Sequence, residues 1–358
     1  MKKFLAVIMA MMLCLSMIGV AAADEAVVSW YTFGDVYLTS VRTALEEAMT
    51  AQGLSFQMKD SNANQQTQTD DINTALVTGA NAIVINMVES GAIGTAETLM
   101  NTVAQYGVPA VFFNRAVSTD DAEAAALFLG YEKSAFIGTK FDEAGKMQGD
   151  MIGEFVLANY DAIDLNKDGV ISYVMFKGDE ANQEAILRTQ YGVENADAIL
   201  TAAGKPALAY YDAGATTKYL VDMNGTWSNT ASFEYMSTIL AQYNPAQGNM
   251  VEVVIANNDD MALGAVNALT NIGYNTGVAG DPVIPVFGVD ATDAAKELIA
   301  AGRMTGTIKQ DAVGMADAVA HITANLVAGK DKFDGLNPAY GQVDGWMVTI
   351  PYAMYTGE

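Results

Sequence analysis

The chain has 358 residues, of which 42 are acidic and 18 basic, and its formal net charge is −24. This charge excludes the classes of protein that bind nucleic-acid phosphate or anionic lipid through clustered Lys and Arg side chains. With one Cys and one His, the sequence supports neither a disulfide framework nor a zinc finger. Half of the residues are apolar, which is typical of a folded chain, and the length suggests about two domains.

The first 23 residues have the pattern of an export signal. Lys2 and Lys3 give a positive start, a nearly unbroken apolar run follows, and three alanines ending at Ala23 supply a small-residue cleavage site. A retained membrane anchor is the alternative, because about 20 apolar residues span a bilayer. The small residues favour cleavage after Ala23. Because Cys14 lies in this segment, we expect an exported chain without cysteine, in the periplasm or on the outer side of the cell surface.

From residue 26 onward, short apolar runs alternate with longer segments of helical periodicity. The first series predicts strands at 26–32, 55–59, 82–87 and 109–114 and helices at 36–52, 66–78 and 91–106. A long stretch at 134–161 is predicted to be helical. The second series predicts strands at 172–176, 207–211, 251–256, 283–289 and 304–308 and helices at 183–203, 230–242, 261–271, 293–300 and 314–328.

Repeated β-α-β units with short connections predict parallel sheets covered by helices on both faces. We therefore expect an α/β protein with two doubly wound, Rossmann-like lobes. Polar residues follow or end several predicted strands, among them Asp35, Asn114, Asn258 and Asp290. Because ligands of open α/β sheets bind at the carboxyl ends of the strands, these residues predict a cleft.

Residues 164–172 match the first nine positions of an EF-hand calcium loop. Oxygen atoms at alternate positions would surround the cation, and Gly169 permits the sharp turn. Position 12, which should be a bidentate Glu, is Met175, and the following segment is predicted to be a strand. The loop is therefore not an EF-hand. It is either a calcium loop that receives a carboxylate from elsewhere in the chain or a solvated Asx turn.

Four segments together resemble the periplasmic galactose/glucose-binding protein family: 111–114, 164–172, 252–259 and 284–290. The similarity runs in order over most of the chain after the signal. It implies the type I periplasmic-binding-protein fold, in which a monosaccharide such as glucose or galactose is held between two hinged lobes. It also implies delivery of the sugar to an ABC-transporter permease and, in some members, presentation to a chemoreceptor. We expect a monomer without enzymatic activity.

The fold implied by the resemblance divides the chain into discontinuous lobes. The N-terminal lobe is expected to comprise 24–133 and about 311–344, and the C-terminal lobe 134–310 and about 345–358. In the same family a remote Glu, here Glu252, completes the calcium shell. The implied Ca²⁺ ligands are Asp164, Asn166, Asp168, Val170 through its carbonyl, Ser172 and Glu252. Ser172 replaces a longer Gln, which predicts a weaker contact with the ion.

The resemblance also implies a sugar site, matched residue by residue. Its members are Asp35, Tyr37, Asn114, Asn182, Glu184, Arg188, Trp227, Asn258, Asp290 and Gln310. A pyranose has apolar faces and an equator of hydroxyls, so aromatic plates (Tyr37 and Trp227) and an edge of acids, amides and Arg suit it. Asn182 stands where the family has His, Glu184 where it has Asp, and Gln310 where it has Asn. These changes leave the epimer open, and 214–226 looks like an insertion before Trp227.

Other interpretations of single residues remain open. Asp35 and Asp290 also suit the caps of following helices, and Arg188 suits a surface ion pair with Glu184 one turn earlier. Trp227 is expected at an exposed helix entry. As a whole, the chain could instead be a sensory module for a receptor kinase or chemoreceptor. The acids Asp35, Glu184 and Asp290 would also suit a glycoside-processing enzyme.

Overall fold

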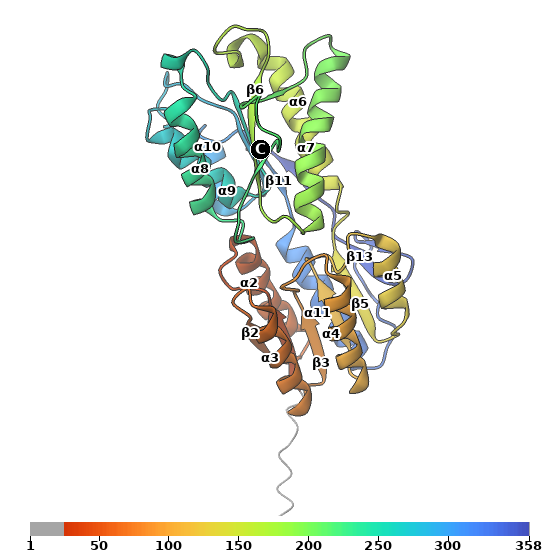
Figure 1. The fold of residues 1–358 in the computed structure, drawn as a ribbon. Helices are drawn as coiled ribbons and strands as arrows, with labels where there is room; N and C mark the ends of the chain where they lie inside the picture. The colour runs from red at the N-terminus through yellow and green to blue at the C-terminus, as the bar shows by residue number, and fades with distance from the viewer. Residues whose placement is uncertain (1–24, 358) are drawn as a thin grey trace, which may run out of the picture.

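The computed structural model describes residues 25–357, which form two α/β lobes joined by three connections (Figure 1). The predicted signal segment and its cleavage site after Ala23 lie outside the described residues. None of the helices within 25–357 is long and apolar enough to cross a membrane.

The first lobe, in the lower half of Figure 1, has a seven-stranded sheet in the order β12-β13-β5-β4-β3-β1-β2. Its elements are β1 (Glu25–Trp30), α2 (Val36–Ala51), β2 (Ser55–Asp60), α3 (Gln65–Val77), β3 (Ala82–Ile85), α4 (Ile93–Gln105), β4 (Ala110–Phe113), α5 (Asp121–Leu129), β5 (Ser134–Gly138), α11 (Ala312–Val327), β12 (Gly341–Val343) and β13 (Met347–Thr349). All neighbouring strands are parallel except β12 and β13.

The second lobe has a sheet in the order β14-β11-β10-β9-β6-β7, and β8 also pairs with β6. Its elements are α6 (Glu143–Ile163), β6 (Ser172–Lys177), α7 (Gln183–Ala202), β7 (Ala209–Tyr210), β8 (Leu220–Val221), α8 (Asn229–Gln242), a 3₁₀ turn η1 (Pro245–Gln247), β9 (Val253–Ala256), α9 (Asp259–Thr270), β10 (Val286–Asp290), α10 (Asp293–Ala300), β11 (Gly306–Lys309) and β14 (Ala353–Tyr355). Only the β11–β14 pair is antiparallel.

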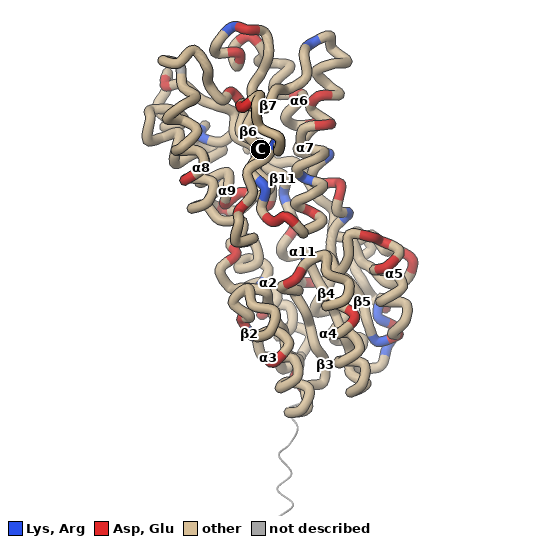
Figure 2. Tube along the Cα trace, viewed as in Figure 1, with Lys and Arg blue, Asp and Glu red and all other residues tan. Residues whose placement is uncertain are grey.

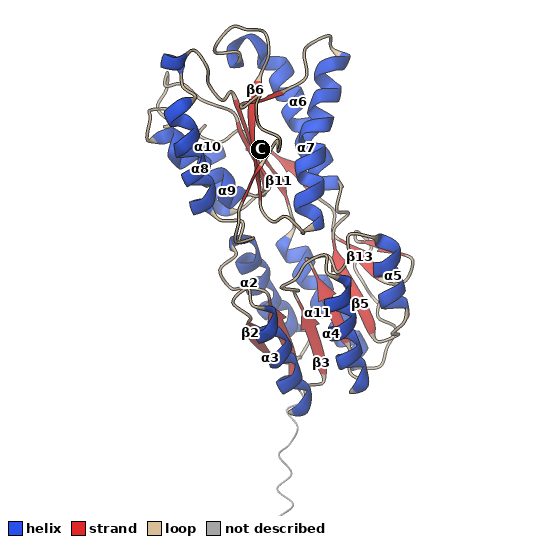
Figure 3. Ribbon diagram, viewed as in Figure 1, coloured by secondary structure: helices blue, strands red, loops and turns tan. Residues whose placement is uncertain are grey.

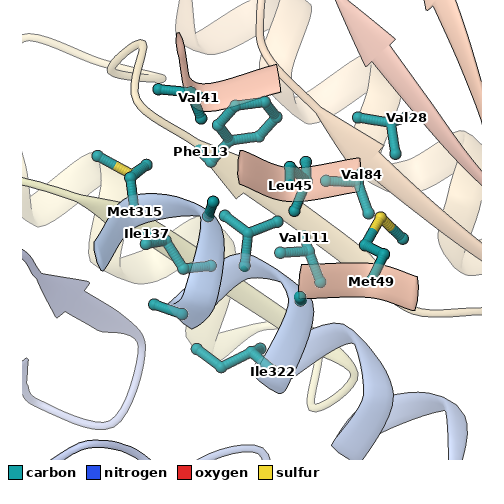
Figure 4. Packing of buried hydrophobic residues seen from close by; sticks show 14 of the residues in the cluster. Val28, Val41, Leu45, Met49, Val84, Val111, Phe113, Ile137, Met315 and Ile322 are labelled. Atoms are coloured by element: carbon teal, nitrogen blue, oxygen red, sulfur yellow. The ribbon is translucent and has the colours of Figure 1, made fainter. Parts of the chain in front are cut away.

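Each sheet is covered on both faces by helices, as Figure 3 shows, which confirms the predicted doubly wound lobes. On one face of the first sheet, α2 and α11 pack side by side over strand residues such as Val28, Val84 and Val111 (Figure 4). The central strands are buried on both faces, which explains their unbroken apolar runs.

The predicted lobe boundaries are wrong at two places. The segment 134–138, assigned to the second lobe within a helical stretch, is strand β5 of the first sheet, where Phe136 pairs in register with Phe112. The C-terminal strand β13, also assigned to the second lobe, pairs with β5. Five apolar or small residues that lie four residues before a long helix carry no periodicity that separates them from it, so the pattern missed this strand.

Candidate functional site

All ten residues predicted to contact sugar line one cavity between the lobes. They are Asp35, Tyr37, Asn114, Asn182, Glu184, Arg188, Trp227, Asn258, Asp290 and Gln310. Leu38 and Arg115 complete the lining of what we call the sugar cavity, and the sequence analysis missed both. Arg115 directly follows Asn114, so its position after β4 was the only available signal. Figure 2 shows acidic and basic positions gathered where the lobes meet, beside the lower end of α7.

The sheets bring these residues together from the ends of their strands. Asn114 follows β4, Asn258 lies just after β9, and Asp290 is the last residue of β10. Asp35 lies between β1 and α2. The expectation that polar residues at the carboxyl ends of strands define a cleft is therefore confirmed by the structure.

Three helices begin at the sugar cavity, and their N-cap residues belong to its lining. Asp35 Oδ1 accepts a hydrogen bond from the Leu38 amide at 2.8 Å at the start of α2. Asn182 caps α7 and Asn258 caps α9 in the same way. Asp35 is therefore both a helix cap and a residue of the cavity lining. Asp290 is not a cap, because Thr292 caps α10.

Arg188 lies at the centre of the hydrogen-bond network. Its Nη2 donates to Gln310 Oε1 at 3.1 Å and to the Tyr352 hydroxyl at 3.0 Å, and it lies 3.3 Å from Glu184 Oε2. The ion pair with Glu184 exists, but it is buried rather than on the surface. Burial alone would lower the pKa of Arg188, but Tyr352, Glu184 and Asp290 outweigh it and raise the pKa. The guanidinium is therefore a fixed positive charge inside the cleft.

Three buried polar atoms in the lining have no hydrogen-bond partner among the described residues: Tyr37 Oη, Arg188 Nε and Gln310 Nε2. A buried polar group that is left unpaired costs roughly 1–3 kcal/mol. Folded proteins rarely leave such groups without a partner, so several in one cavity indicate a binding site for a polar ligand.

Two acids in the cavity are shifted toward the protonated form. Burial raises the pKa of Asp35, although the backbone amide of Leu38 and the charge of Arg115 oppose the shift. Burial also raises the pKa of Asp290 well above its ordinary value, and nearby Asp259 adds to the effect while Arg188 opposes it. Burial has removed water from both carboxylates, so a ligand hydroxyl could donate a hydrogen bond in its place.

Three lining residues have left-handed backbone conformations that residues other than glycine rarely adopt. The φ angles are 61° at Asn114, 58° at Trp227 and 123° at Asp290. Such strain costs about 1–3 kcal/mol per residue and concentrates at functional sites. The conformations of these three residues therefore support a functional role for the cavity.

Trp227 is buried, so the expectation of an exposed ring is wrong. Only 7% of the residue is exposed, and a Cβ placed on Gly178 would come within 2.1 Å of its ring. The chain therefore needs a glycine at 178, directly after β6, to leave room for the indole ring. The Arg188 guanidinium carbon lies 5.7 Å from the ring centroid.

The free space in the sugar cavity is about 30 Å³. Two larger cavities flank it, one of about 360 Å³ and one of about 580 Å³. The size of a cavity therefore does not identify the site in this molecule, whereas its buried polar lining does.

The loop at 164–172 receives Glu252, as the resemblance implied. The Glu252 carboxylate accepts hydrogen bonds from the Ser172 amide at 2.8 Å and the Leu165 amide at 2.7 Å. Asp164 Oδ1 is buried without a partner. Within the loop, Asn166 and Asp168 bond to each other, as in an Asx turn. Within residues 25–357, no three His, Cys, Asp or Glu side chains are arranged to hold a metal ion.

Comparisons with known proteins agree with the fold. Residues 26–331 match the model of the periplasmic binding protein domain. The chain is 32% identical over 333 residues to the D-galactose/methyl-galactoside-binding periplasmic protein MglB of Haemophilus influenzae, covering 92% of this chain and 89% of that protein. It is 22% identical to the ribose import binding protein RbsB of the same organism, covering 94% and 97%.

Solved structures share the fold at lower identity. A solute-binding protein of an ABC transporter from Clostridium phytofermentans, with bound β-D-glucose, has a TM-score of 0.70 at 17% identity, with 93% of this chain and 94% of that chain covered. One from Bacillus halodurans, with bound myo-inositol, has a TM-score of 0.68 at 21% identity, with 95% and 96% covered. The chain thus belongs to the periplasmic binding protein family, and its resemblance to the galactose/glucose-binding members is confirmed.

Proposed function

We propose that this protein binds a monosaccharide of the glucose or galactose type between its lobes, outside the cytoplasm, and delivers it to an ABC transporter. The observation that carries the proposal is the sugar cavity, which is lined by acids, amides and two Arg side chains and in which three buried polar atoms have no partner among the described residues. A ring of sugar hydroxyls both donates and accepts, so it can satisfy this mixed set. The most similar relative described above is named for galactose and methyl-galactoside, which supports the same ligand class.

Entry of a sugar requires the lobes to move, because most of the residues that line the sugar cavity are buried between them. The lobes touch across the cleft, where Arg115 Nη2 lies 3.3 Å from Asp179 Oδ2 and Asn182 Nδ2 donates to Ser90 Oγ at 3.1 Å. An open arrangement would admit the sugar, and the bound sugar would stabilise a closed one. A permease, or a chemoreceptor in the alternative sensory role, would recognise the closed form.

The proposal is tested by titration calorimetry of the purified protein with a panel of hexoses and pentoses. We expect at least one hexose to bind and Arg188→Ala to abolish the heat of binding. A matched control is Arg303→Ala, because Arg303 donates to Asn275 and Thr270 far from the cavity. If no monosaccharide binds the wild-type protein, the proposed function is wrong.

A glycoside-processing enzyme is less well supported by the same acids. Glu184 Oε1 already accepts hydrogen bonds from Thr139 at 2.7 Å and Tyr352 at 2.9 Å, and its other oxygen pairs with Arg188. A carboxylate held in this way is suited to positioning Arg188 rather than to transferring a proton. Release of nitrophenol from nitrophenyl glycosides would revive the enzymatic hypothesis.

We further propose that the loop at 164–172 binds Ca²⁺ through Asp164, Asn166, Asp168, the Val170 carbonyl, Ser172 and Glu252. Asp164 and Glu252 are both buried and both accept hydrogen bonds from backbone amides of this loop, and no Lys, Arg or His among the described residues forms an ion pair with either. Asp164 Oδ1 lacks a partner as well. Two buried carboxylates without a counter-charge are costly, and a hard cation would compensate them.

Removal of calcium should lower the thermal midpoint of unfolding. An ion that binds only the folded chain at about 100 times its Kd adds about 2.7 kcal/mol, which corresponds to roughly 5 °C for a chain of this size. The measurement compares melting in Ca²⁺ and in a chelator, for the wild type and for Glu252→Gln. Equal midpoints for the wild type in both conditions would leave the loop as an Asx turn.

A further inference from the structure

A second cavity, of about 360 Å³, opens beside the sugar cavity and shares Arg115 with it. We call it the outer cavity. Tyr31, Val88 and Arg115 of the first lobe line one side, and Asp179 and the segment 221–225 of the second lobe line the other. Its volume lies at the lower end of the range for small-molecule sites, about 300–1,000 Å³. A molecule that extends out of the sugar cavity past Arg115 would therefore enter a space of suitable size.

Arg115 is held rigidly at the junction of the two cavities. Its Nε donates to the Met87 carbonyl at 2.6 Å, and its Nη2 donates to the Val88 carbonyl at 3.2 Å and to Asp179 at 3.3 Å. The guanidinium carbon lies 4.1 Å from the centroid of the Tyr31 ring. Its Nη1 has no acceptor among the described residues, so two donor hydrogens are left for a ligand at this point.

Tyr31 supplies a second, independent sign of a ligand. The residue is only 2% exposed, it lines the outer cavity, and its hydroxyl has no hydrogen-bond partner. Burial raises the pKa of this hydroxyl, so it stays protonated and is available as a donor. A polar atom that is buried in a cavity of this size without a partner indicates a polar ligand there.

The opposite wall is a turn that also holds the ring of Trp227. The Asp222 carboxylate accepts hydrogen bonds from the Asn224 amide at 3.0 Å, the Thr226 hydroxyl at 2.9 Å and the Ser228 amide at 3.0 Å. Burial would raise the pKa of Asp222, but these hydrogen bonds outweigh it and lower the pKa, so the carboxylate stays ionised. The segment 214–226, which looks like an insertion, therefore builds one wall of the outer cavity.

We propose that the outer cavity is a subsite for the second sugar ring of a disaccharide whose first ring occupies the sugar cavity. The proposal rests on the monosaccharide site of the proposed function. The apolar side chains Val88, Val221 and Met223 suit the faces of a sugar ring, and the Tyr31 hydroxyl and Arg115 Nη1 suit its hydroxyls. The Arg115 charge is already compensated by Asp179, which favours a neutral ligand over an anionic one.

The test is titration calorimetry with glucose and galactose and with the disaccharides maltose, cellobiose, melibiose and lactose, which vary the linkage and the first ring. We expect at least one disaccharide to bind at least as tightly as the monosaccharide of its first ring. Tyr31→Phe, which removes one hydroxyl and keeps the ring, should weaken that disaccharide about fivefold, the effect of one hydrogen bond. Binding of the monosaccharide should change less than twofold.

A second variant blocks the subsite without touching the sugar cavity. Asn224 is exposed on the turn and lines only the outer cavity, so Asn224→Trp should weaken the disaccharide at least tenfold and leave the monosaccharide within twofold. Val278→Trp, at a residue that is 64% exposed elsewhere on the second lobe, is the matched control. If monosaccharides bind but no disaccharide does, or if Asn224→Trp weakens both equally, the subsite is wrong while the proposed function stands. If neither class binds, the proposed function itself fails.

Discussion

At the scale of single residues, the cleft contains one charge that stays constant, on Arg188, and one that can change with protonation, on Asp290. Arg188 is compensated by Glu184 and linked to Gln310 and Tyr352, so its charge is fixed. The Asp290 carboxylate accepts no hydrogen bond from the described residues, and burial raises its pKa well above 3.8. Its protonation therefore depends on pH and on what enters the cavity.

Sugar affinity should fall as the pH is lowered through the raised pKa of Asp290, at values above 3.8, because a protonated carboxyl forms weaker hydrogen bonds with hydroxyls than a carboxylate does. The stability of the free protein should respond in the opposite direction. The native state binds this proton more tightly than the unfolded state, so the Asp290 contribution to the free energy of unfolding rises as the pH falls. Calorimetry and thermal melting from pH 4 to pH 8, on wild type and Asp290→Asn, measure both effects. Parallel pH profiles for the two proteins would contradict this role of Asp290.

At the scale of elements, helix starts and one turn position side chains that line the sugar cavity. The helices α2, α7 and α9 all begin at the sugar cavity, and each uses a lining residue as its N-cap. The turn at 222–228 positions Trp227, whose φ of 58° does not occur in a regular helix or strand. Local hydrogen bonds thus fix the geometry of residues whose other polar atoms face the cleft.

Asp222→Ala should loosen this turn. The variant loses three hydrogen bonds to an ionised carboxylate, so we expect the free energy of unfolding to fall by about 2–3 kcal/mol and sugar affinity to fall about tenfold as Trp227 moves. Asp212→Ala is the matched control, because the Asp212 side chain accepts a single local hydrogen bond, from Gly214. Denaturant unfolding and calorimetry give the two quantities. A stable Asp222→Ala protein with normal affinity would show that the turn holds without its carboxylate.

At the scale of the whole molecule, the alternating pattern predicted the two lobes and the strand-end cleft, since a parallel sheet leaves a strong signal in its buried strands. The pattern could not predict how the chain divides between the lobes. Strand β5 is too short to stand out from the helix after it, and β13 joins the first sheet only through tertiary pairing. Arg115 was missed because its role depends on Asp179, a residue of the other lobe. The residues predicted to contact sugar came from a family resemblance, and their convergence on one cavity could be seen only in the structure.

Closure of the lobes should depend on one glycine. A Cβ on Gly91, in the first lobe, would come within 2.7 Å of the Ala181 carbonyl oxygen in the second, so Gly91→Ala should hold the lobes apart. The φ of 78° at Gly91 adds backbone strain, and Gly107→Ala reproduces that strain at a φ of 70° where no atom lies within 4 Å. We expect Gly91→Ala to weaken sugar binding at least tenfold and to reduce the sugar-induced decrease in radius of gyration, measured by small-angle scattering. Gly107→Ala should lose a similar amount of stability and keep normal binding. If both variants bind sugar equally well, contact between Gly91 and Ala181 does not limit closure, and the lobes must meet elsewhere when the sugar is enclosed.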